Sequence, residues 1–393
     1  MATPPASAAA TVANAVAKTA TVFTTSTTGF TPRTTFEVSS SVTRSYFLGH
    51  HNAALAKMRQ TISNVGLIIE CRDFRIPVTS WNPLLERTLA ERPRIIVYTH
   101  RDLGPPKPQA TRIMSTLRDF HLPSSSSNTT NTNTKAVLFL SNEPQTHTPL
   151  LATIKSLARE HDSLTGLRAL VVGMPNAGKS TLLNRLRARG MNLPKAAKTG
   201  AQPGVTRKFG TPVRIAPGES TLLPGSEGLG EGVFIVDTPG VFIPYVAKPE
   251  DMLKMALVGC VKDGLVPAMT VADYLLYHLN RVDPGIYQDK FCKGEATNDV
   301  HEFLKGVALR TGKLRKGGEV SLEGAAEWVV QEWRRGGLGK FVLDEVSEGT
   351  LREAVRAAEE PALSMNQARK KEKEGRKVRN EMKRLGISPS AEG

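Results

Sequence analysis

Cysteine is scarce in this sequence, and long apolar runs are absent. Only Cys71, Cys260 and Cys292 occur among 393 residues, and no two of them form a C-x-x-C pair. Neither a disulfide framework nor a zinc site is therefore expected. No stretch approaches about 18 uninterrupted apolar residues, so the sequence predicts no transmembrane helix. The hydrophobic content of 40% is ordinary for a soluble globular protein, and the length suits two or three domains.

Acidic residues are missing from the start of the chain. The first 36 residues contain no Asp or Glu, are rich in Ala, Ser and Thr, and include the basic residues Lys18 and Arg33. This composition is typical of an organelle transit peptide. A disordered segment without a targeting role is the alternative, and the low arginine content keeps a plastid destination open beside a mitochondrial one. We therefore predict a transit peptide or disordered segment over residues 1–44.

Basic residues, in contrast, are in excess over the whole chain. The formal net charge is +15 and the isoelectric point is about 9.8. Such a balance suits a polyanionic partner, namely RNA, DNA or an anionic membrane surface, without choosing among them. The segment 367–386 carries nine Lys or Arg against three Glu. We interpret residues 351–393 as a basic tail, either a solvated helix or an arm.

Short apolar runs alternate with helix-compatible stretches from about residue 45 onward. Short length and Val, Ile and Leu content favour buried strands for these runs, which are VGLIIE (65–70), RIIVYT (94–99), AVLFL (136–140), LRALVVG (167–173) and VFIVD (233–237). The alternation predicts an α/β domain over 45–249, built on a doubly wound, mostly parallel sheet. Within it, 124–134 is interpreted as a low-complexity surface loop and 216–232 as a Gly/Pro-rich hairpin or loop. Helix-compatible segments alone follow, which predicts a smaller α-helical domain over 250–350.

A glycine-rich loop joins the fourth apolar run to a helix-compatible stretch. The segment GMPNAGKST (173–181) matches G-x-x-x-x-G-K-[ST], a pattern that binds phosphate. Its glycines let backbone N–H groups converge on phosphate oxygens, and its lysine supplies a charge to the β- and γ-phosphates. The predicted phosphate-binding residues are Gly173, Asn176, Ala177, Gly178, Lys179, Ser180 and Thr181, with Gly240 from the motif described next.

A second motif, DTPG (237–240), directly follows the fifth apolar run. Asp237 stands where a magnesium-organising carboxylate is expected, and Gly240 offers a backbone N–H and the freedom for a switch. Between the two motifs, Thr206 lies in a Pro/Gly-hinged loop and is a candidate for a further magnesium ligand. The predicted magnesium ligands are therefore Ser180, Thr206 and Asp237.

No base-reading motif follows Gly240, and the best match lies upstream. In YTHRDLG (98–104), Asp102 fits the guanine-reading pattern N-K-x-D, whereas Thr99 and His100 stand where Asn and Lys are expected. The later segment FLSN (139–142) resembles the loop that backs the base. The predicted base-binding residues are Thr99, His100, Asp102, Leu103, Ser141 and Asn142. Both loops precede the phosphate loop, which is the motif order of a circularly permuted GTPase.

Three further segments resemble the circularly permuted ribosome-assembly GTPases of the YlqF/RbgA type, and among these the mitochondrial ribosome-assembly members. They are YFLGHHNAALAKM (46–58), CRDFRIPVTSWNP (71–83) and GKLRKGGEVSLEGAAEWVVQEWRRGGLGKF (312–341). The resemblance implies a GTPase that binds GTP and GDP with Mg²⁺ and acts in assembly of the large ribosomal subunit, with rRNA and ribosomal proteins as partners. It also implies the mitochondrial matrix as location, with a peripheral association with the inner membrane.

The activation of the attacking water is less clear from the residues. Val241 stands where a Ras-like GTPase has its water-orienting glutamine, so slow hydrolysis is expected without an activator. The resemblance offers His50 as the catalytic group and Asn176 as a ligand for K⁺. Two other readings stay open: an ATPase or small-molecule kinase, and a nucleotide-dependent RNA-binding scaffold that does not hydrolyse.

Overall fold

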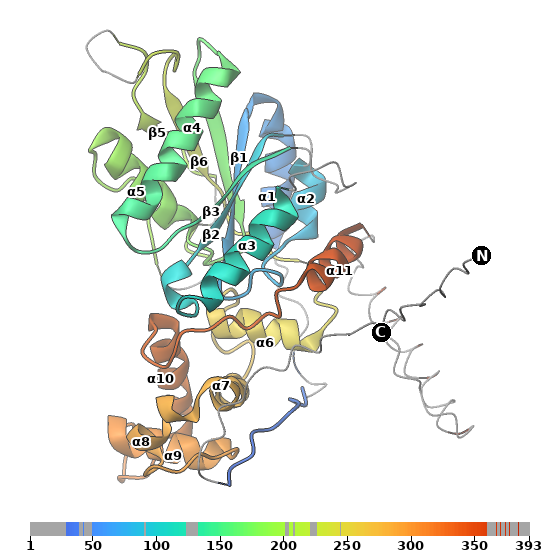
Figure 1. Cartoon of the computed structure of the whole chain (residues 1–393), viewed down its shortest axis with the longest axis vertical. Helices are drawn as coiled ribbons and strands as arrows, with labels where there is room; N and C mark the ends of the chain where they lie inside the picture. Colours follow the sequence, from blue (N-terminus) through green and yellow to red (C-terminus); the bar gives the residue numbers. More distant parts are fainter. Residues whose placement is uncertain are drawn as a thin grey trace, which may run out of the picture.

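The computed structural model describes residues 29–38, 42, 49–89, 92–122, 133–200, 204–206, 209–220, 226–243 and 245–359, with five isolated positions between 367 and 384. These residues form a sheet domain (49–243) and a helical domain (245–344), which lie one above the other in Figure 1. Most of the low-complexity segment 124–134 lies outside the described residues, as does nearly all of the tail beyond 359.

The sheet domain is built on six strands in the order β3-β2-β1-β4-β6-β5. Every neighbouring pair is parallel except β5 and β6. The strands are β1 (Leu67–Asp73), β2 (Arg94–Thr99), β3 (Thr134–Phe139), β4 (Leu167–Gly173), β5 (Val213–Ala216) and β6 (Val233–Asp237). The doubly wound, mostly parallel sheet is confirmed, and each of the five apolar runs forms a strand. The short antiparallel edge strand β5 was not predicted.

Helices cover both faces of this sheet, because alternate residues of each strand point to opposite sides. In β1, Leu67 and Ile69 pack with α4 (Thr148–His161) and α5 (Lys179–Met191), whereas Ile68 packs with the helices of the other face. That other face is covered by α1 (Gly49–Thr61), α2 (Pro83–Leu89) and α3 (Gln109–His121). Burial on both faces explains why the strands read as continuous apolar runs.

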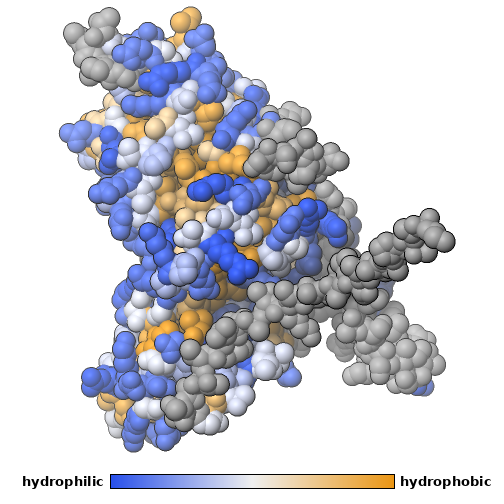
Figure 2. Space-filling view, viewed as in Figure 1, coloured by the Kyte–Doolittle hydropathy of each residue, from blue (hydrophilic) through white to orange (hydrophobic). Residues whose placement is uncertain are grey.

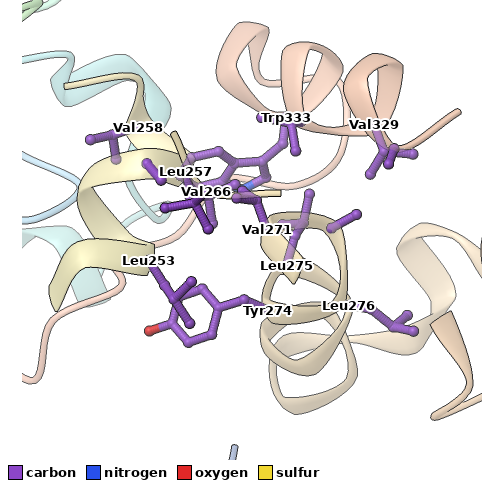
Figure 3. Close-up of a cluster of buried hydrophobic side chains, with 14 of the residues drawn as sticks. Leu253, Leu257, Val258, Val266, Val271, Tyr274, Leu275, Leu276, Val329 and Trp333 are labelled. Carbon is purple, nitrogen blue, oxygen red and sulfur yellow. The ribbon is translucent and has the colours of Figure 1, made fainter. Parts of the chain in front are cut away.

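The helical domain consists of α6 (Pro249–Val258), α7 (Ala268–Val282), α8 (Gln288–Phe291), α9 (Val300–Thr311) and α10 (Leu322–Arg335). Figure 3 shows its core, in which Trp333 of α10 lies among apolar side chains of α6 and α7. Three buried residues of the sheet domain, Ile76, Met174 and Phe242, belong to the same core. The two domains therefore share a packed interface beneath the carboxyl ends of the strands. Short 3₁₀ helices lie at Ile62–Asn64, Arg101–Leu103, Pro144–His147 and Pro284–Ile286.

The two ends of the described chain do not follow the predicted boundaries. Residues 29–38, which we assigned to a leader or disordered segment, lie against α7: Arg33 forms an ion pair with Asp273 at 2.6 Å, and Phe36 packs edge-on to Tyr274. Ion pairing and aromatic burial fix this segment although its composition resembles a leader. At the other end, α11 (Glu348–Glu359) returns to the sheet domain and buries Leu351, so the tail predicted from residue 351 begins later.

Hydrophilic side chains dominate the face shown in Figure 2, with hydrophobic side chains exposed over both domains. Among the described residues, no helix combines the length and the apolar character that a bilayer crossing requires.

Candidate nucleotide site

The predicted site residues gather at the carboxyl edge of the parallel strands. In the sheet, β2 and β3 follow β1 on one side, whereas β6 and β5 lie beyond β4 on the other. The strand order therefore reverses between β1 and β4, which flank the topological switch point. Ligands of open α/β sheets bind at this position, where the loops after neighbouring strands diverge. The loops after β1, β2, β4 and β6 all end here, and Figure 1 shows α6 and α10 lying just beyond them.

The phosphate loop has the backbone geometry that its glycines predict. Gly173 and Gly178 have φ of 141° and 77°, and Asn176 also lies in the left-handed region with φ of 57°. A Cβ atom on Gly173 would come within 2.2 Å of the Cys71 carbonyl oxygen, so no side chain fits there. The first turn of α5 begins at Lys179. Its N–H groups and the helix dipole therefore face the loop, as anion binding requires.

Lys179 is buried and donates to backbone carbonyls of its own loop. Its Nζ lies 2.7 Å from the Met174 oxygen and 3.3 Å from the Gly173 oxygen. Burial lowers the pKa of Lys179, and the nearby carboxylate of Asp237 partly opposes this effect. The ammonium thus lies inside the phosphate loop, where phosphate oxygens could replace the two carbonyl oxygens as its hydrogen-bond acceptors.

The three predicted magnesium ligands lie in direct contact. The Ser180 hydroxyl donates to Asp237 Oδ2 at 2.5 Å and lies 3.1 Å from the Thr206 hydroxyl, which is 3.4 Å from the same carboxylate oxygen. The second carboxylate oxygen, Asp237 Oδ1, is buried and has no hydrogen-bond partner among the residues that the structure describes. Oxygen donors are what Mg²⁺ prefers, and a buried carboxylate oxygen without a partner fits a cation with bound water. The donor set therefore suits Mg²⁺.

Thr99 takes over the bracing function expected of asparagine. Its hydroxyl lies 3.1 Å from the Ala177 carbonyl in the phosphate loop and 3.1 Å from the Arg72 carbonyl at the end of β1. A hydroxyl has one proton, so it donates to one of these oxygens at a time. The departure from the N-K-x-D pattern at this position thus preserves a link between the base loop and the phosphate loop.

His100 is paired with the carboxylate of Asp73. Its Nδ1 lies 3.2 Å from Asp73 Oδ2, and the residue adopts left-handed backbone geometry with φ of 57°. Burial by itself raises the pKa of Asp73, but the charges of Arg75 and His100 outweigh it and hold the pKa below its usual range. The ring also lines the nucleotide cavity.

The remaining base-loop residues are half-buried or exposed and are connected by hydrogen bonds. Asp102 accepts from the backbone N–H of Asn142 at 3.2 Å and from its side-chain amide at 3.1 Å. Arg185 in turn donates to Asn142 Oδ1 and to the Ser141 carbonyl. Each oxygen of Asp102 keeps acceptor capacity, because a carboxylate has about four lone-pair sites. Leu103 lies in the 3₁₀ turn beside Asp102.

A cavity of about 310 Å³ links the phosphate loop with the helical domain. Most of the predicted phosphate-binding residues line it, together with Thr206 and His100, whereas Asp102, Leu103, Ser141 and Asn142 do not. Sequence reasoning missed Gln331, Arg334 and Arg335 of α10, which complete the wall. These three lie in the segment 312–341, whose family resemblance was the available signal, but their place at the cavity depends on how α10 packs. Arg75, also missed, lies in the segment CRDFRIPVTSWNP, whose family resemblance was the available signal.

Val241, His50 and Asn176, the residues considered for water activation and K⁺ binding, lie in different surroundings. Val241 is fully buried in the apolar core with Leu55 and Met58 of α1, so its side chain does not face the cavity. His50 is the second residue of α1, but its side chain lies outside the described part of the structure. Asn176 donates its amide to the Gly259 carbonyl at 2.6 Å, which ties the phosphate loop to the end of α6.

Comparisons with known proteins agree with this geometry. Residues 168–293 match the family described as 50S ribosome-binding GTPase. The chain is 37% identical to mitochondrial GTPase 1 of Schizosaccharomyces japonicus, over 82% of this chain and 97% of the relative. The chain belongs to the mitochondrial GTPase 1 family. It is also 33% identical to the mouse mitochondrial ribosome-associated GTPase 1, over 76% of this chain and 89% of the relative. Ribosome biogenesis GTPase A of Priestia megaterium is 27% identical over 78% and 98%, respectively.

Membership of the mitochondrial GTPase 1 family confirms the circularly permuted GTPase fold and the hydrolysis of GTP. A GTPase of this kind uses Mg²⁺ to hold the β- and γ-phosphates, which agrees with the contact among Ser180, Thr206 and Asp237. The roles of the single residues remain predictions, because the comparisons do not assign them.

Proposed function

We propose that this GTPase is a switch in assembly of the mitochondrial large ribosomal subunit, slow by itself and accelerated by the particle. The observation that carries the proposal is the shared cavity, in which α10 of the helical domain contributes Gln331, Arg334 and Arg335 to the wall of the phosphate site. A ligand that moves this helix changes the nucleotide site directly. The names of the relatives point to ribosomes as that ligand, and the net charge of +15 suits rRNA.

Each predicted site residue has a task in this proposal. The phosphate loop and Gly240 bind the β- and γ-phosphates, and Ser180, Thr206 and Asp237 hold Mg²⁺, which neutralises charge on the transferred phosphoryl group when bound. Thr99, His100, Asp102, Leu103, Ser141 and Asn142 receive the guanine. Asn176 is the candidate ligand of K⁺, and the Gly259 carbonyl would orient its amide for that contact.

The slow basal rate follows from the buried position of Val241. A side chain in the apolar core cannot orient water, so Val241 does not replace the glutamine that Ras-like GTPases use. His50 on α1 is the proposed catalytic group, which the ribosomal particle would bring to the attacking water. This assignment rests on the family resemblance of the segment 46–58.

Single-turnover hydrolysis with and without mitochondrial large subunits tests the proposal. We expect at least a tenfold stimulation, equal to about 1.4 kcal/mol of barrier. It should weaken with rising salt, because docking on RNA releases counterions. Stimulation should be stronger in K⁺ than in Na⁺ if Asn176 holds the ion. His50→Ala should lower the stimulated rate without weakening GTP binding. Fast hydrolysis by the free protein, unaffected by subunits, would contradict the proposed switch.

We propose the mitochondrion as location, peripheral on the matrix side of the inner membrane, with the plastid as the alternative. The mitochondrial names of the relatives and the acid-free start of the chain support this. The contacts of residues 29–38 with α7 imply that a leader, if removed, ends before that segment. Cell fractionation with mitochondrial, plastid and inner-membrane markers in one gradient would separate these locations.

A further inference from the structure

The segment after β1, residues 74–82, touches the helical domain and the loop that follows β6, residues 238–243, which we call the switch loop; apart from Arg75 it does not line the nucleotide cavity. We call residues 74–82 the bridge segment. Near its middle, the backbone N–H groups of Val78 and Thr79 both donate to Asp344 Oδ2 at 2.8 Å, and the Thr79 hydroxyl donates to Asp344 Oδ1 at 2.6 Å. Lys254 of α6 lies 3.2 Å from the same carboxylate. The bridge segment is thus fixed on the helical domain.

The last residue of the bridge segment, Asn82, reaches the switch loop that follows β6. Asn82 is 1% exposed, and its side-chain amide donates to the Val241 carbonyl at 2.8 Å. Its side-chain oxygen accepts from the backbone N–H of Leu84 at 3.0 Å and so caps α2. One buried side chain therefore contacts both α2 and the loop after β6, which belong to different halves of the sheet domain.

The contact with Val241 completes a set of anchors around Gly240. The Thr238 hydroxyl donates to the Val171 carbonyl at 2.7 Å, and the Val241 N–H donates to the Gly173 carbonyl at 3.2 Å. Asn82 holds the carbonyl side of Val241. The backbone on both sides of Gly240 is therefore fixed to buried groups of other elements.

Gly240 itself is pressed against the phosphate loop. A Cβ atom at this position would lie 2.5 Å from the Pro175 nitrogen, and the residue lines the nucleotide cavity. No acceptor among the described residues takes its N–H. A fixed N–H that faces a phosphate-binding cavity is a preorganised donor, and its direction depends on the peptide units beside it.

We propose that Asn82 is a positioning residue for the reaction: its hydrogen bond to the Val241 carbonyl orients the Gly240 N–H toward the γ-phosphate. The proposal rests on the proposed nucleotide site and names a residue outside its motifs. Since the γ-phosphate is the group that distinguishes GTP from GDP, Asn82 acts on the discrimination between these nucleotides. The bridge segment is also hydrogen-bonded to Asp344. It therefore connects the helical domain to the switch loop, in addition to the connection that α10 makes at the cavity wall.

Asn82→Asp isolates this contact from the capping of α2. The introduced carboxylate keeps an oxygen that accepts from Leu84 N–H, but it replaces the amide donor by an acceptor that faces the Val241 carbonyl. We expect the affinity for a non-hydrolysable GTP analogue to fall at least tenfold, while the affinity for GDP changes less than twofold. The rate constant kcat should fall as well. A merely structural defect would weaken both nucleotides alike, and that result would overturn the proposal.

A pH profile gives a second readout that a structural role would not change. Burial raises the pKa of a carboxyl group, and in its protonated form the introduced carboxyl can donate to the Val241 carbonyl. The kcat of Asn82→Asp relative to wild type should therefore rise as pH falls. A ratio that stays flat with pH would count against the hydrogen bond as the cause.

Asn280→Asp is the matched control. Asn280 is also buried, and its amide donates to the Thr297 carbonyl at 2.9 Å in the helical domain, away from the cavity. It should lower thermal stability without changing the ratio of analogue to GDP affinity. If Asn82→Asp does not fold, Asn82→Ser retains a cap and should show the same selective loss. Wild-type protein that binds neither nucleotide would refute the proposed function, whereas wild-type binding with an unchanged ratio in both variants refutes only the role of Asn82.

Discussion

The phosphate end and the base end of the nucleotide site are built in different ways. At the phosphate end, Lys179 and Asp237 are buried, and backbone groups of the loop define the geometry. At the base end, Asp102 is joined to Asn142 by hydrogen bonds that are open to solvent. The two residues that depart from the N-K-x-D pattern lie between these two ends: Thr99 is buried and bonds to the phosphate loop, and His100 pairs with Asp73. The departures therefore lie where the base end adjoins the phosphate end, whereas the solvent-open Asp102 matches the pattern.

The largest effect is expected at the phosphate end, from Lys179→Ala. The variant loses the buried ammonium, and no other residue of the motif supplies charge to the β- and γ-phosphate oxygens. Affinity for GTP should fall by at least about a hundredfold, which corresponds to about 2.7 kcal/mol. Equilibrium titration with a fluorescent nucleotide measures it, and ATP binding should be lost equally. Retained affinity would show that the loop does not bind phosphate.

A smaller effect, limited to selectivity, is expected at the base end from Asp102→Asn. An amide presents a donor where guanine needs an acceptor for its N1 and exocyclic amine, so the preference for GTP over ATP should drop by about tenfold. Competition of GTP, ATP and xanthosine triphosphate for one fluorescent probe measures this preference. If the wild-type protein already binds ATP as well as GTP, the changes at Thr99 and His100 have removed the selectivity for guanine. The phosphate end would then bind nucleotide without help from base recognition.

The smallest effect is expected where the two ends meet, at Thr99→Val. Valine keeps the shape beside Gly178 and removes the hydroxyl that lies 3.1 Å from the Ala177 carbonyl. Affinity for GTP and ATP should fall together by about threefold to tenfold, in line with one neutral hydrogen bond. Thr99→Asn restores the usual residue and should bind as well as wild type. A loss confined to GTP would place Thr99 with the base end and contradict its bracing role.

The sequence predicts those parts of the site that depend on local order. Apolar runs predict the five parallel strands because their burial on both faces leaves a continuous pattern. The contact between Ser180 and Asp237 follows from motifs that enter a helix and end a strand, and Thr206 joins them from the loop between these motifs. The edge strand β5 escapes prediction because it has four residues between Pro212 and Pro217, too few to show a period.

The rest depends on contacts between distant parts of the chain. The position of α10 beside the phosphate loop is set by packing around Trp333, and the family resemblance of the segment 312–341 did not indicate which of its residues line the cavity. The bond from Asn82 to Val241 joins residues 159 positions apart. No spacing rule connects such a pair, although both segments carry recognisable patterns. Side-chain positions in the base loop were also unpredictable, because His100 meets Asp73 only through the pairing of β1 with β2.

The contacts of residues 29–38 with the helical domain determine when this segment can pack during synthesis. Arg33 pairs with Asp273, 240 positions later, and the carbonyl of Thr31 accepts from Asn298, 267 positions later. During synthesis the early segment therefore lacks these partners until most of the protein has followed. Contacts of such separation form late, because a long loop must close first. Residues 29–38 therefore pack only once the helical domain is complete, and until then their side chains are open to other contacts.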